Sequence, residues 1–430
     1  MKKMQAPKGT FDILPYSTQE TWKLSSLWQE LEQVIREVTK DYGYLEIRTP
    51  IYESTELFDR GAGETSDIVT KEMFTFKDRG DRSISLRPEG TAAVMRSMIE
   101  NHMVDRGGLH KLYYVGPMFR YERPQSGRYR QHHQFGIEVV GTSSFLQDVE
   151  VMDLLLELYR RVGLKNTSLL INSVGDIASR SSFKEALLQF LTPHLKELSA
   201  DSQLRFEKNP LRILDSKDPN DRKILENAPS ILDFLSPEAK KHFDAVCRSL
   251  DALKIPYTID PCIVRGLDYY NHTVFEIVSK DLGSQATVGA GGRYDGLLKT
   301  FGGPDLPSVG CATGMERLLQ VMIAQKESVS SLQGPVVYFV GLDEATRQKA
   351  FELASSCRHA RIEAQIELGN YKLQNGLQNA VKMEAQFCAI LGRDEMDQGK
   401  IQIKDLKTRD SFAIDFSEMI PFFQDKKRQK

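Results

Sequence analysis

The stretch GPMFRYERPQSGRYRQHHQFGIEVVG, residues 116–141, predicts two strands joined by a polar loop. A strand that returns directly after such a loop pairs antiparallel with its predecessor, because a parallel partner needs a long crossover connection. The charged residues of the loop are Arg120, Glu122, Arg123, Arg128 and Arg130. Four guanidinium groups against one carboxylate can clamp phosphate, hold a nucleic-acid backbone or face solvent.

Strand-like and helix-like patterns on both sides of this hairpin indicate the fold class. Strands are predicted at 83–86, 111–115, 134–140 and 274–278, and helices between them at 91–102 and 148–162. Strands that follow one another, rather than alternating strictly with helices, favour an antiparallel sheet. The fold class is therefore predicted to be α+β.

The residues before this region predict a helix followed by an edge strand. Residues 17–20 have capping-box spacing, and apolar residues recur at helical intervals over 24–38. Gly43 ends the predicted helix, and alternation over 45–51 predicts a half-buried strand. Pro50 in that strand requires a sheet edge or a subunit boundary, because proline donates no ladder hydrogen bond.

Two changes of pattern divide the rest of the chain. Residues from about 173 to 252 are mainly helical in composition, which indicates an insertion. The Ser-rich stretch 326–334 predicts a linker, and strands alternate with helices after it, which predicts a small parallel α/β domain. We therefore expect one domain over 1–325, a linker over 326–334 and a second domain over 335–430.

Composition and charge exclude several classes of protein. Of 430 residues, 40% are hydrophobic and 27% charged, with a net charge of −2, which is typical of a globular chain without a general affinity for polyanions. The five cysteines show neither CxxC nor zinc-site spacing, so we expect no metal site and a reducing compartment. No apolar run is long enough to span a bilayer and the N-terminus has no leader pattern, so a cytoplasmic protein is expected.

Two further polar clusters complete the candidate site. Arg265-Gly-Leu-Asp-Tyr-Tyr270 precedes a strand and the glycine-rich run Gly289-Ala-Gly-Gly-Arg-Tyr-Asp-Gly296. Those glycines fit either a hairpin turn or close backbone approach to a ligand. GCATGMERLL, residues 310–319, predicts a strand that runs into a helix with Arg317 at the junction. Beside a phosphate site, that arginine would stabilise charge.

Together these blocks resemble the signature motifs of class II aminoacyl-tRNA synthetases, and those at 265–270 and 291–296 are similar to the blocks peculiar to the histidyl-tRNA synthetase family. Residues 17–50 resemble motif 1, residues 119–122 motif 2 and residues 314–317 motif 3. The resemblance extends over essentially the whole chain. It implies an antiparallel-sheet catalytic domain flanked by helices, a mainly helical insertion and a C-terminal α/β anticodon-binding domain.

The resemblance also implies a reaction. ATP would activate L-histidine to histidyl-adenylate with release of pyrophosphate, and the 3′-terminal ribose of tRNA(His) would then accept the histidine. The substrate carboxylate is already ionised, so the first step needs neutralisation of phosphate charge rather than a general base. In the family that work falls to Arg120, Arg265 and Arg317 with Mg²⁺, and the residues that match the ATP site are Arg120, Glu122, His132 and Arg317.

Recognition of histidine and tRNA is implied in the same way. The residues that match the histidine site are Glu89, Thr91, Gln134, Glu138, Arg265, Tyr269 and Tyr270, with Glu138 and Tyr270 on the imidazole. Arg123 and Gln125 match residues that read tRNA. His132 departs from the family pattern, which commonly has phenylalanine there. Motif 1 implies a homodimer, and no membrane partner is expected.

Two other functions compete with this interpretation. The synthetase-like regulatory subunit of ATP phosphoribosyltransferase binds histidine without charging tRNA. Such paralogues typically lack the C-terminal domain and some phosphate-binding arginines, whereas this chain has residues 335–430 together with Arg120, Arg265 and Arg317. A synthetase for another amino acid is disfavoured by the two histidine-specific blocks.

Overall fold

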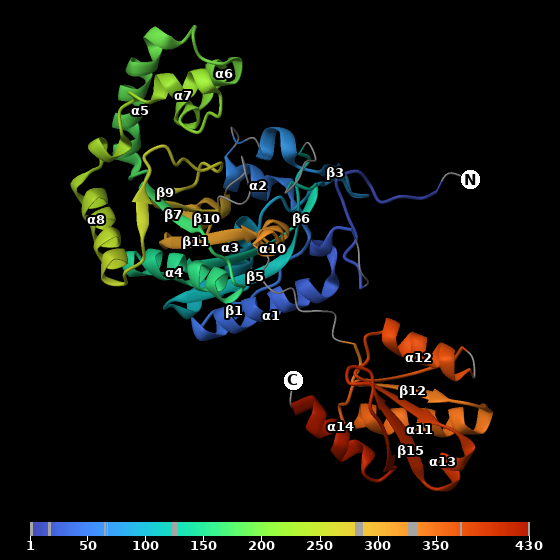
Figure 1. Cartoon of the computed structure of the whole chain (residues 1–430). Coiled ribbons are helices and arrows are strands. Elements are labelled where there is room, and N and C mark those ends of the chain that lie inside the picture. Colours follow the sequence, from blue (N-terminus) through green and yellow to red (C-terminus); the bar gives the residue numbers. More distant parts are fainter. Residues whose placement is uncertain are drawn as a thin grey trace. The chain divides into compact units, whose positions relative to one another are not determined.

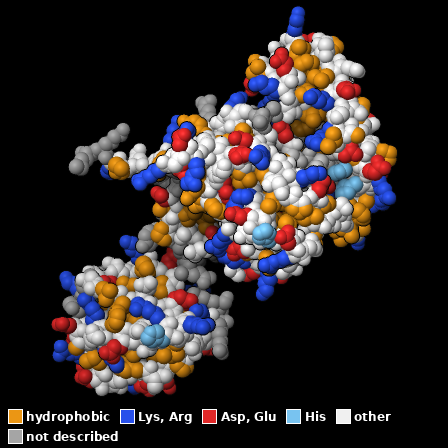
Figure 2. Space-filling view, turned by 180° about the vertical axis from the view of Figure 1, so that it is seen from behind, with side chains coloured by type: hydrophobic (Ala, Val, Ile, Leu, Met, Phe, Trp, Pro, Cys, Tyr) orange, Lys and Arg blue, Asp and Glu red, His pale blue; other side chains and the backbone are white. Residues whose placement is uncertain are grey.

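The computed structural model describes residues 3–15, 19–63, 66, 68–122, 128–279, 287–325, 334–369 and 372–428. The chain divides into two compact units, Met1–Val329 and Ser330–Lys430 (Figure 1). On the face shown in Figure 2, basic and acidic side chains are intermixed on each unit, as the net charge of −2 predicts. None of the helices in the described part of the chain has the length and apolar character needed to cross a bilayer.

The first unit is built on a largely antiparallel sheet. Its strands, in spatial order, are β1 (Leu45–Glu46), β5 (His110–Phe119), β6 (Gln131–Val140), β11 (Ser308–Gly314), β10 (Thr287–Arg293), β9 (Asn271–Ser279), β7 (Thr167–Ser173) and β8 (Tyr257–Ile259). All pairs from β5 to β7 are antiparallel, and only the outer pairs β1–β5 and β7–β8 are parallel. The predicted α+β class is confirmed, and the sheet brings residues from four distant segments together.

Helices cover this sheet because each carries one apolar face. In α1 (Ser25–Asp41), Leu27, Leu31, Ile35 and Val38 are all buried at helical spacing. The long helix α4 (Phe145–Arg161) and α10 (Met315–Ala324) pack against β11 and β6, respectively. The remaining elements here are α2 (Thr55–Ala62), η2 (Ile68–Glu72), α3 (Thr91–Glu100), η3 (Val104–Arg106), α9 (Leu297–Thr300) and a small sheet of β2 (Tyr52–Ser54), β4 (Ser83–Leu86) and β3 (Thr75–Lys77).

The N-terminal elements differ from their prediction. A short η1 (Thr21–Lys23) precedes α1, which begins at Ser25, and residues 17 and 18 of the predicted capping box lie outside the described residues. The predicted strand over 45–51 is interrupted between β1 and β2. In this gap Pro50 has no N–H to donate, and the buried guanidinium of Arg87 has the carbonyl oxygens of Thr49 (3.0 Å) and Pro50 (3.4 Å) as hydrogen-bond acceptors.

A helical region lies between β7 and β8 and has its own core of buried apolar side chains. Its elements are α5 (Ile177–Leu191), η4 (Thr192–His194), α6 (Ala200–Lys208), η5 (Pro210–Ile213), α7 (Pro219–Leu225), η6 (Ile231–Phe234) and α8 (Pro237–Ala252). The hydroxyls of Ser199, Ser202 and Ser216 all donate to the buried carboxylate of Asp221. That this region is an insertion stays a prediction.

The second unit contains a mixed sheet. The strands β12 (Val337–Gly341), β13 (Ala364–Ile366) and β14 (Phe387–Leu391) pair in parallel, as predicted. The predicted parallel pairing applies to these three strands only, because β15 (Lys400–Asp405) and β16 (Ser411–Asp415) continue the sheet antiparallel. The helices are α11 (Glu344–His359), α12 (Leu373–Lys382), α13 (Arg393–Asp397) and α14 (Met419–Arg428).

A buried ion pair ties β10 to α4. The Arg293 guanidinium, 1% exposed, donates to both carboxylate oxygens of Asp148 at 3.2 and 2.6 Å. It also donates to the backbone oxygens of Thr142 and Ser144, so its charge is well satisfied. Removal of one partner of such a pair leaves the other charge buried, with neither its counter-ion nor water beside it.

We expect Asp148→Asn to lower the free energy of unfolding of the first unit by about 1.5–3 kcal/mol, because it removes the charge of the main partner of the buried Arg293 guanidinium, which keeps only the ion pair with Asp295 at 3.2 Å. Urea unfolding followed by tryptophan fluorescence measures this, since both tryptophans of the chain, Trp22 and Trp28, lie in this unit. Asp305→Asn is the control, because it breaks the exposed pair with Lys299. Equal effects of the two substitutions would contradict the prediction.

Candidate active site

A cavity of about 260 Å³ opens where β6, β10 and β11 meet the start of α10. Five of the predicted site residues line it, namely Arg120, Glu122, His132, Gln134 and Arg317. These residues come from two blocks far apart in sequence, 116–141 and 310–319. Residues 287–290 of β10 complete the lining, and the antiparallel ladder β6–β11–β10 brings the three segments around one space.

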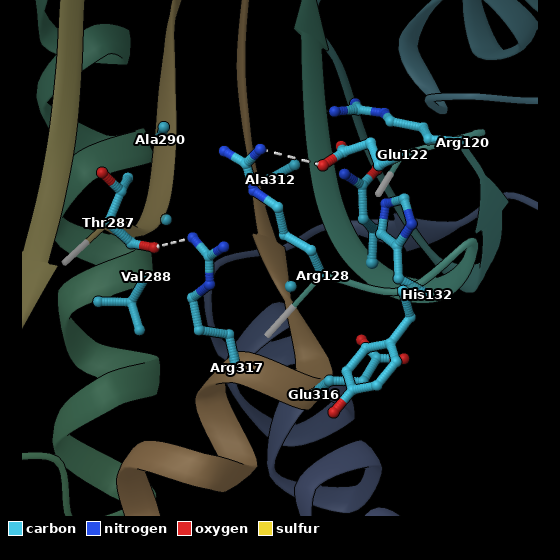
Figure 3. Close-up of a pocket in the computed structure, with 14 residues that line it drawn as sticks. Arg120, Glu122, Arg128, His132, Thr287, Val288, Ala290, Ala312, Glu316 and Arg317 are labelled. Carbon is cyan, nitrogen blue, oxygen red and sulfur yellow. Dashed lines mark hydrogen bonds and ion pairs between the residues drawn. The ribbon is translucent and has the colours of Figure 1, made fainter. Parts of the chain in front are cut away.

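Three arginines converge on this cavity from different elements. Figure 3 shows Arg128 directed at the carboxylate of Glu122, with 3.2 Å between the paired atoms, and Arg317 directed at Thr287. Arg317 donates to the backbone oxygen of Thr287 at 2.5 Å, and Arg120 donates to the backbone oxygen of Pro88 at 2.9 Å. Burial and the like charge of Arg128 lower the pKa of Arg317. Fixed guanidinium groups in this number suit a polyphosphate.

His132 stands on the wall of the same cavity as a neutral ring. Burial lowers its pKa to about 3, and the positive charges of Arg120, His133 and Arg317 act in the same direction. The imidazole is therefore uncharged near neutral pH and presents a flat face to the space beside it (Figure 3).

The motif 3 glutamate fixes the strand that carries His132. Glu316 is buried, and its carboxylate accepts hydrogen bonds from the backbone N–H of His133 at 2.8 and 3.0 Å. The Nδ1 atom of the His133 ring lies 2.8 Å from the same carboxylate. Sequence patterns assigned no individual role to Glu316, because its partner His133 lies in another segment, and they treated Arg128 only as one of four loop arginines.

A second polar cluster surrounds the buried carboxyl of Glu138 on β6, the strand that also carries the cavity residues His132 and Gln134. Thr91 donates its hydroxyl to Glu138 at 2.7 Å, and the Tyr294 hydroxyl donates to the other oxygen. Glu89, also buried, accepts the backbone N–H groups of Thr91 and Ala92 at 2.5 and 3.0 Å, so it holds the first turn of α3. Two buried carboxyls thus meet at Thr91.

The environment of Glu138 favours its neutral form. Burial raises its pKa to about 8, and the nearby Glu89 charge adds to the shift, while the hydrogen bonds from Tyr294 and Thr91 oppose it. Gly310 makes the room, because a Cβ there would lie 2.5 Å from a carboxyl oxygen of Glu138. A carboxyl that burial keeps neutral can release its proton when a cation or an N–H donor binds, and the resulting carboxylate then pairs with that group.

Three tyrosine rings cluster beside this carboxyl, with Tyr294 edge-on to both Tyr269 and Tyr270. The ring centroids of Tyr269 and Tyr270 are 4.7 Å apart, and those of Tyr294 lie 5.4 and 6.0 Å from them. The predicted residues Tyr269, Tyr270, Thr91, Glu89 and Glu138 are therefore neighbours. Tyr294 contacts Glu138, Tyr269 and Tyr270. Sequence patterns assigned it no role, because it lies in a glycine-rich run.

Arg265 lies in an adjoining cavity of about 160 Å³ with Tyr270 and does not line the larger one. It donates to Glu276 at 2.5 Å, and the other oxygen of Glu276 accepts the Thr287 hydroxyl at 2.8 Å. Because Thr287 also bonds Arg317, the two arginines face each other across Glu276 and Thr287. Arg123 and Gln125 lie outside the described residues.

The run Gly289–Arg293 belongs to β10 and pairs on both sides, so the hairpin-turn interpretation is wrong for it. Among the described residues, no group of three or more His, Cys, Asp or Glu side chains is placed to hold a metal ion.

Comparison with known proteins decides the family. A family model described as Histidyl-tRNA synthetase matches residues 13–318, and one described as Anticodon binding domain matches residues 331–426. The chain belongs to the histidyl-tRNA synthetase family. The predicted family and function are thereby confirmed, and the family's reaction is an ATP-dependent ligation of histidine to tRNA.

Individual relatives agree with the histidyl-tRNA synthetase assignment. A histidine–tRNA ligase of Protochlamydia amoebophila is 51% identical over 419 residues, which cover 97% of this chain and 99% of the relative. One of Bacillus subtilis is 46% identical over 417 residues, or 96% and 97% of the two chains. The solved apo structure of S. aureus histidyl-tRNA synthetase has a TM-score of 0.82 at 38% identity and covers 98% of this chain and all of that one.

A structure described as an ATP phosphoribosyltransferase regulatory subunit/histidyl-tRNA synthetase from Bacillus halodurans C has a TM-score of 0.64 at 21% identity. It covers 90% of this chain and 97% of its own. At that identity the likeness shows a shared fold alone.

We expect Glu138→Gln to flatten the pH dependence of stability. The folded-state pKa of about 8 lies above the ordinary 4.5, so the folded state holds the proton more tightly and wild-type stability falls as pH rises between these values. Glutamine mimics the protonated carboxyl, so the stability of the variant relative to wild type should increase from about pH 5 to about pH 8. Urea unfolding across this range measures the difference; Glu185→Gln, at an exposed position, is the control. A difference that does not change with pH would contradict the shifted carboxyl.

Proposed function

We propose that the 260 Å³ cavity binds ATP, that the space around Glu138 binds histidine, and that the chain charges tRNA(His) there in two steps. One observation carries the proposal: three guanidinium groups and a neutral ring surround a cavity, and the strand β6 that lines it also carries a buried carboxyl that lies among three tyrosine rings. The first environment complements a nucleoside triphosphate, and the second complements an imidazole.

Each ATP residue has a role that its surroundings support. Arg120 and Arg317 neutralise phosphate charge, and Arg317 also covers one face of adenine. His132 stacks on the purine. Its neutral state favours this contact, since a protonated ring would place a further positive charge beside the arginines. Glu122 accepts the adenine amino group. To these residues we add Arg128, whose position between Glu122 and Arg317 suits a phosphate oxygen.

Histidine is bound through its ring, ammonium and carboxylate. Glu138 and Tyr270 pair with the two ring nitrogens, and a site with buried polar groups rejects analogues that lack them. Glu89, Thr91 and Gln134 hold the ammonium; Gln134 supports this, because its buried Oε1 has no hydrogen-bond partner among the described residues. Tyr269 lines the pocket, and Arg265 holds the substrate carboxylate beside the α-phosphate.

The chemistry follows from this placement. A carboxylate oxygen of histidine forms a bond to the α-phosphorus while the bond to pyrophosphate breaks, and Arg120, Arg265 and Arg317 stabilise the charge on the oxygens in between. A hydroxyl of the terminal ribose of tRNA then attacks the acyl carbon and releases AMP. Arg123 and Gln125 are proposed to contact tRNA.

Mg²⁺ suits the donors that are present. Magnesium usually takes one or two protein carboxylates together with substrate phosphates and water. Glu276 faces both Arg265 and Arg317, so its carboxylate is the candidate ligand for a cation carried by the triphosphate. The cation would neutralise pyrophosphate as it leaves.

A homodimer and a cytoplasmic location complete the proposal. The motif 1 region exposes three apolar side chains, with Leu45 71%, Ile51 46% and Tyr52 58% accessible. A patch of this kind beside an edge strand suits an interface with a second copy. The regulatory-subunit alternative is less supported, because the chain matches an anticodon binding domain and retains all three arginines.

Histidine-dependent pyrophosphate–ATP exchange tests the function. We expect exchange with histidine and with no other amino acid, and Arg265→Ala should lower kcat by about 10²–10³ while the KM for histidine changes little, because its charge acts mainly in the transition state. Arg160→Ala, at an exposed arginine of α4, is the control. Histidine binding without exchange would favour the regulatory subunit, and an unchanged kcat in Arg265→Ala would remove Arg265 from the mechanism.

Oligomeric state has its own test. Ile51→Asp should convert the dimer to a species of one chain mass, 48.8 kDa, because it puts a charge into an apolar interface. Light scattering with size exclusion measures the mass. Leu253→Asp, at an exposed leucine outside the motif 1 region, should leave the dimer intact. A wild-type monomer, or an unaffected Ile51→Asp dimer, would contradict the interface.

A further inference from the structure

The segment 7–14, here called the strap, begins with a turn and ends at Leu14, which pairs with the residues around the start of α1. Thr10 donates its backbone N–H to Pro7 at 3.1 Å, which closes a tight turn with Gly9 at φ +87°, as a type II turn requires. Leu14 exchanges backbone hydrogen bonds with Lys23 and Ser25 at 2.8 Å each. The turn is thus closed within the strap, and Leu14 ties the C-terminal end of the strap to residues 23–25.

The strap pairs with residues 128–133, here called the return arm, which lead from the motif 2 loop into β6. The backbone N–H of Arg130 donates to the Gly9 oxygen at 2.8 Å, and its oxygen accepts from Arg120 at 2.9 Å. Its guanidinium carbon lies 3.9 Å from the centre of the Tyr121 ring. At the base of the hairpin, Arg130 is thus joined by one backbone hydrogen bond to Gly9 of the strap and by one to Arg120.

An aromatic cluster makes the second contact. The Phe11 ring lies 4.9 Å from Tyr129 and 4.7 Å from Trp22, and Trp22 lies 5.3 Å from Tyr129. Tyr129 lines the ATP cavity and accepts a hydrogen bond from Gln320 at 3.2 Å. Its neighbours in sequence, Arg128 and His132, face the cavity in Figure 3. The strap thus touches the outer side of the wall that the nucleotide would contact from within.

We propose that the strap is a positioning element for nucleotide binding: Gly9 and Phe11 hold the return arm so that Arg128, Tyr129 and His132 stand preset for ATP. This inference rests on the proposed function of the cavity. The mechanism is preorganisation, since Arg130, the last arm residue before β6, has Gly9 of the strap as a backbone partner, and small displacements of a binding wall are costly.

The turn glycine allows a sharp test. A Cβ at Gly9 would lie 2.8 Å from Cγ and 2.9 Å from Cδ of Arg130, so Gly9→Ala should push the return arm outward. Gly43 has a similar φ of +75°, but a Cβ there meets nothing within 4 Å in the described part of the chain. Gly43→Ala therefore carries the same conformational strain without the displacement, which makes it the matched control.

Both tryptophans of the chain report on this region, because Trp22 contacts Phe11 and Trp28 lies 4.9 Å from the His133 ring. We expect Mg·ATP to change tryptophan emission in wild type and in Gly43→Ala. In Gly9→Ala, the dissociation constant from this titration and the KM for ATP in exchange should each rise about tenfold, while the KM for histidine changes less than about twofold. Phe11→Ala should show the same split, and Phe11→Tyr should restore wild-type values.

Two results would contradict the positioning role of the strap. One is equal ATP affinity in Gly9→Ala and Gly43→Ala; the other is an equal rise of the KM for ATP and the KM for histidine in Gly9→Ala. If Gly9→Ala does not fold, the Phe11→Ala and Phe11→Tyr pair decides in the same way. Failure of the proposed function is separate, because wild type would then show no histidine-dependent exchange, while the fluorescence titration with Mg·ATP would still report on the strap.

Discussion

The register of the central ladder is the constraint on which the site depends. Glu138 of β6 pairs with Gly310 of β11, and Gly310 pairs with Gly292 of β10, so one carboxyl and two residues without side chains form a row across the sheet. The bare backbone leaves space for the carboxyl of Glu138 and for the rings of Tyr294 and Tyr270. A slip of one residue would turn Glu138 to the opposite face, where the helices pack, and no site would form.

The balance of charge differs between the two halves of the site. Three arginines with Glu122 and Glu316 border the larger cavity, where His132 is neutral, while the buried carboxyls of Glu89 and Glu138 lie among tyrosines in the other half. The link between the halves is Glu276 with Thr287, which bonds Arg265 on one side and Arg317 on the other. An anionic nucleotide and a substrate with an ammonium and an imidazole are thereby directed to adjacent places.

Sequence patterns predicted the α+β class, the helices and the three blocks that meet, because periodicity and motif spacing are local signals. They could not predict the hydrogen bonds that Arg87 makes in the gap after β1, because Arg87 reaches back from a later segment. The pairing of Glu316 with His133 and the position of Tyr294 over Glu138 are tertiary in the same sense. The antiparallel strands β15 and β16 were within reach, since Ile401, Ile403, Phe412 and Ile414 alternate with polar residues.

The central claim is that a buried carboxyl, neutral in the empty site, receives the imidazole of histidine. Carbon-13 NMR of glutamate labelled at Cδ, with Glu138→Gln to assign the signal, follows that carboxyl directly. The account predicts a titration midpoint near 8 without ligand and an ionised carboxylate at neutral pH once histidine is added. A midpoint at the ordinary 4.5 that histidine does not move would contradict it.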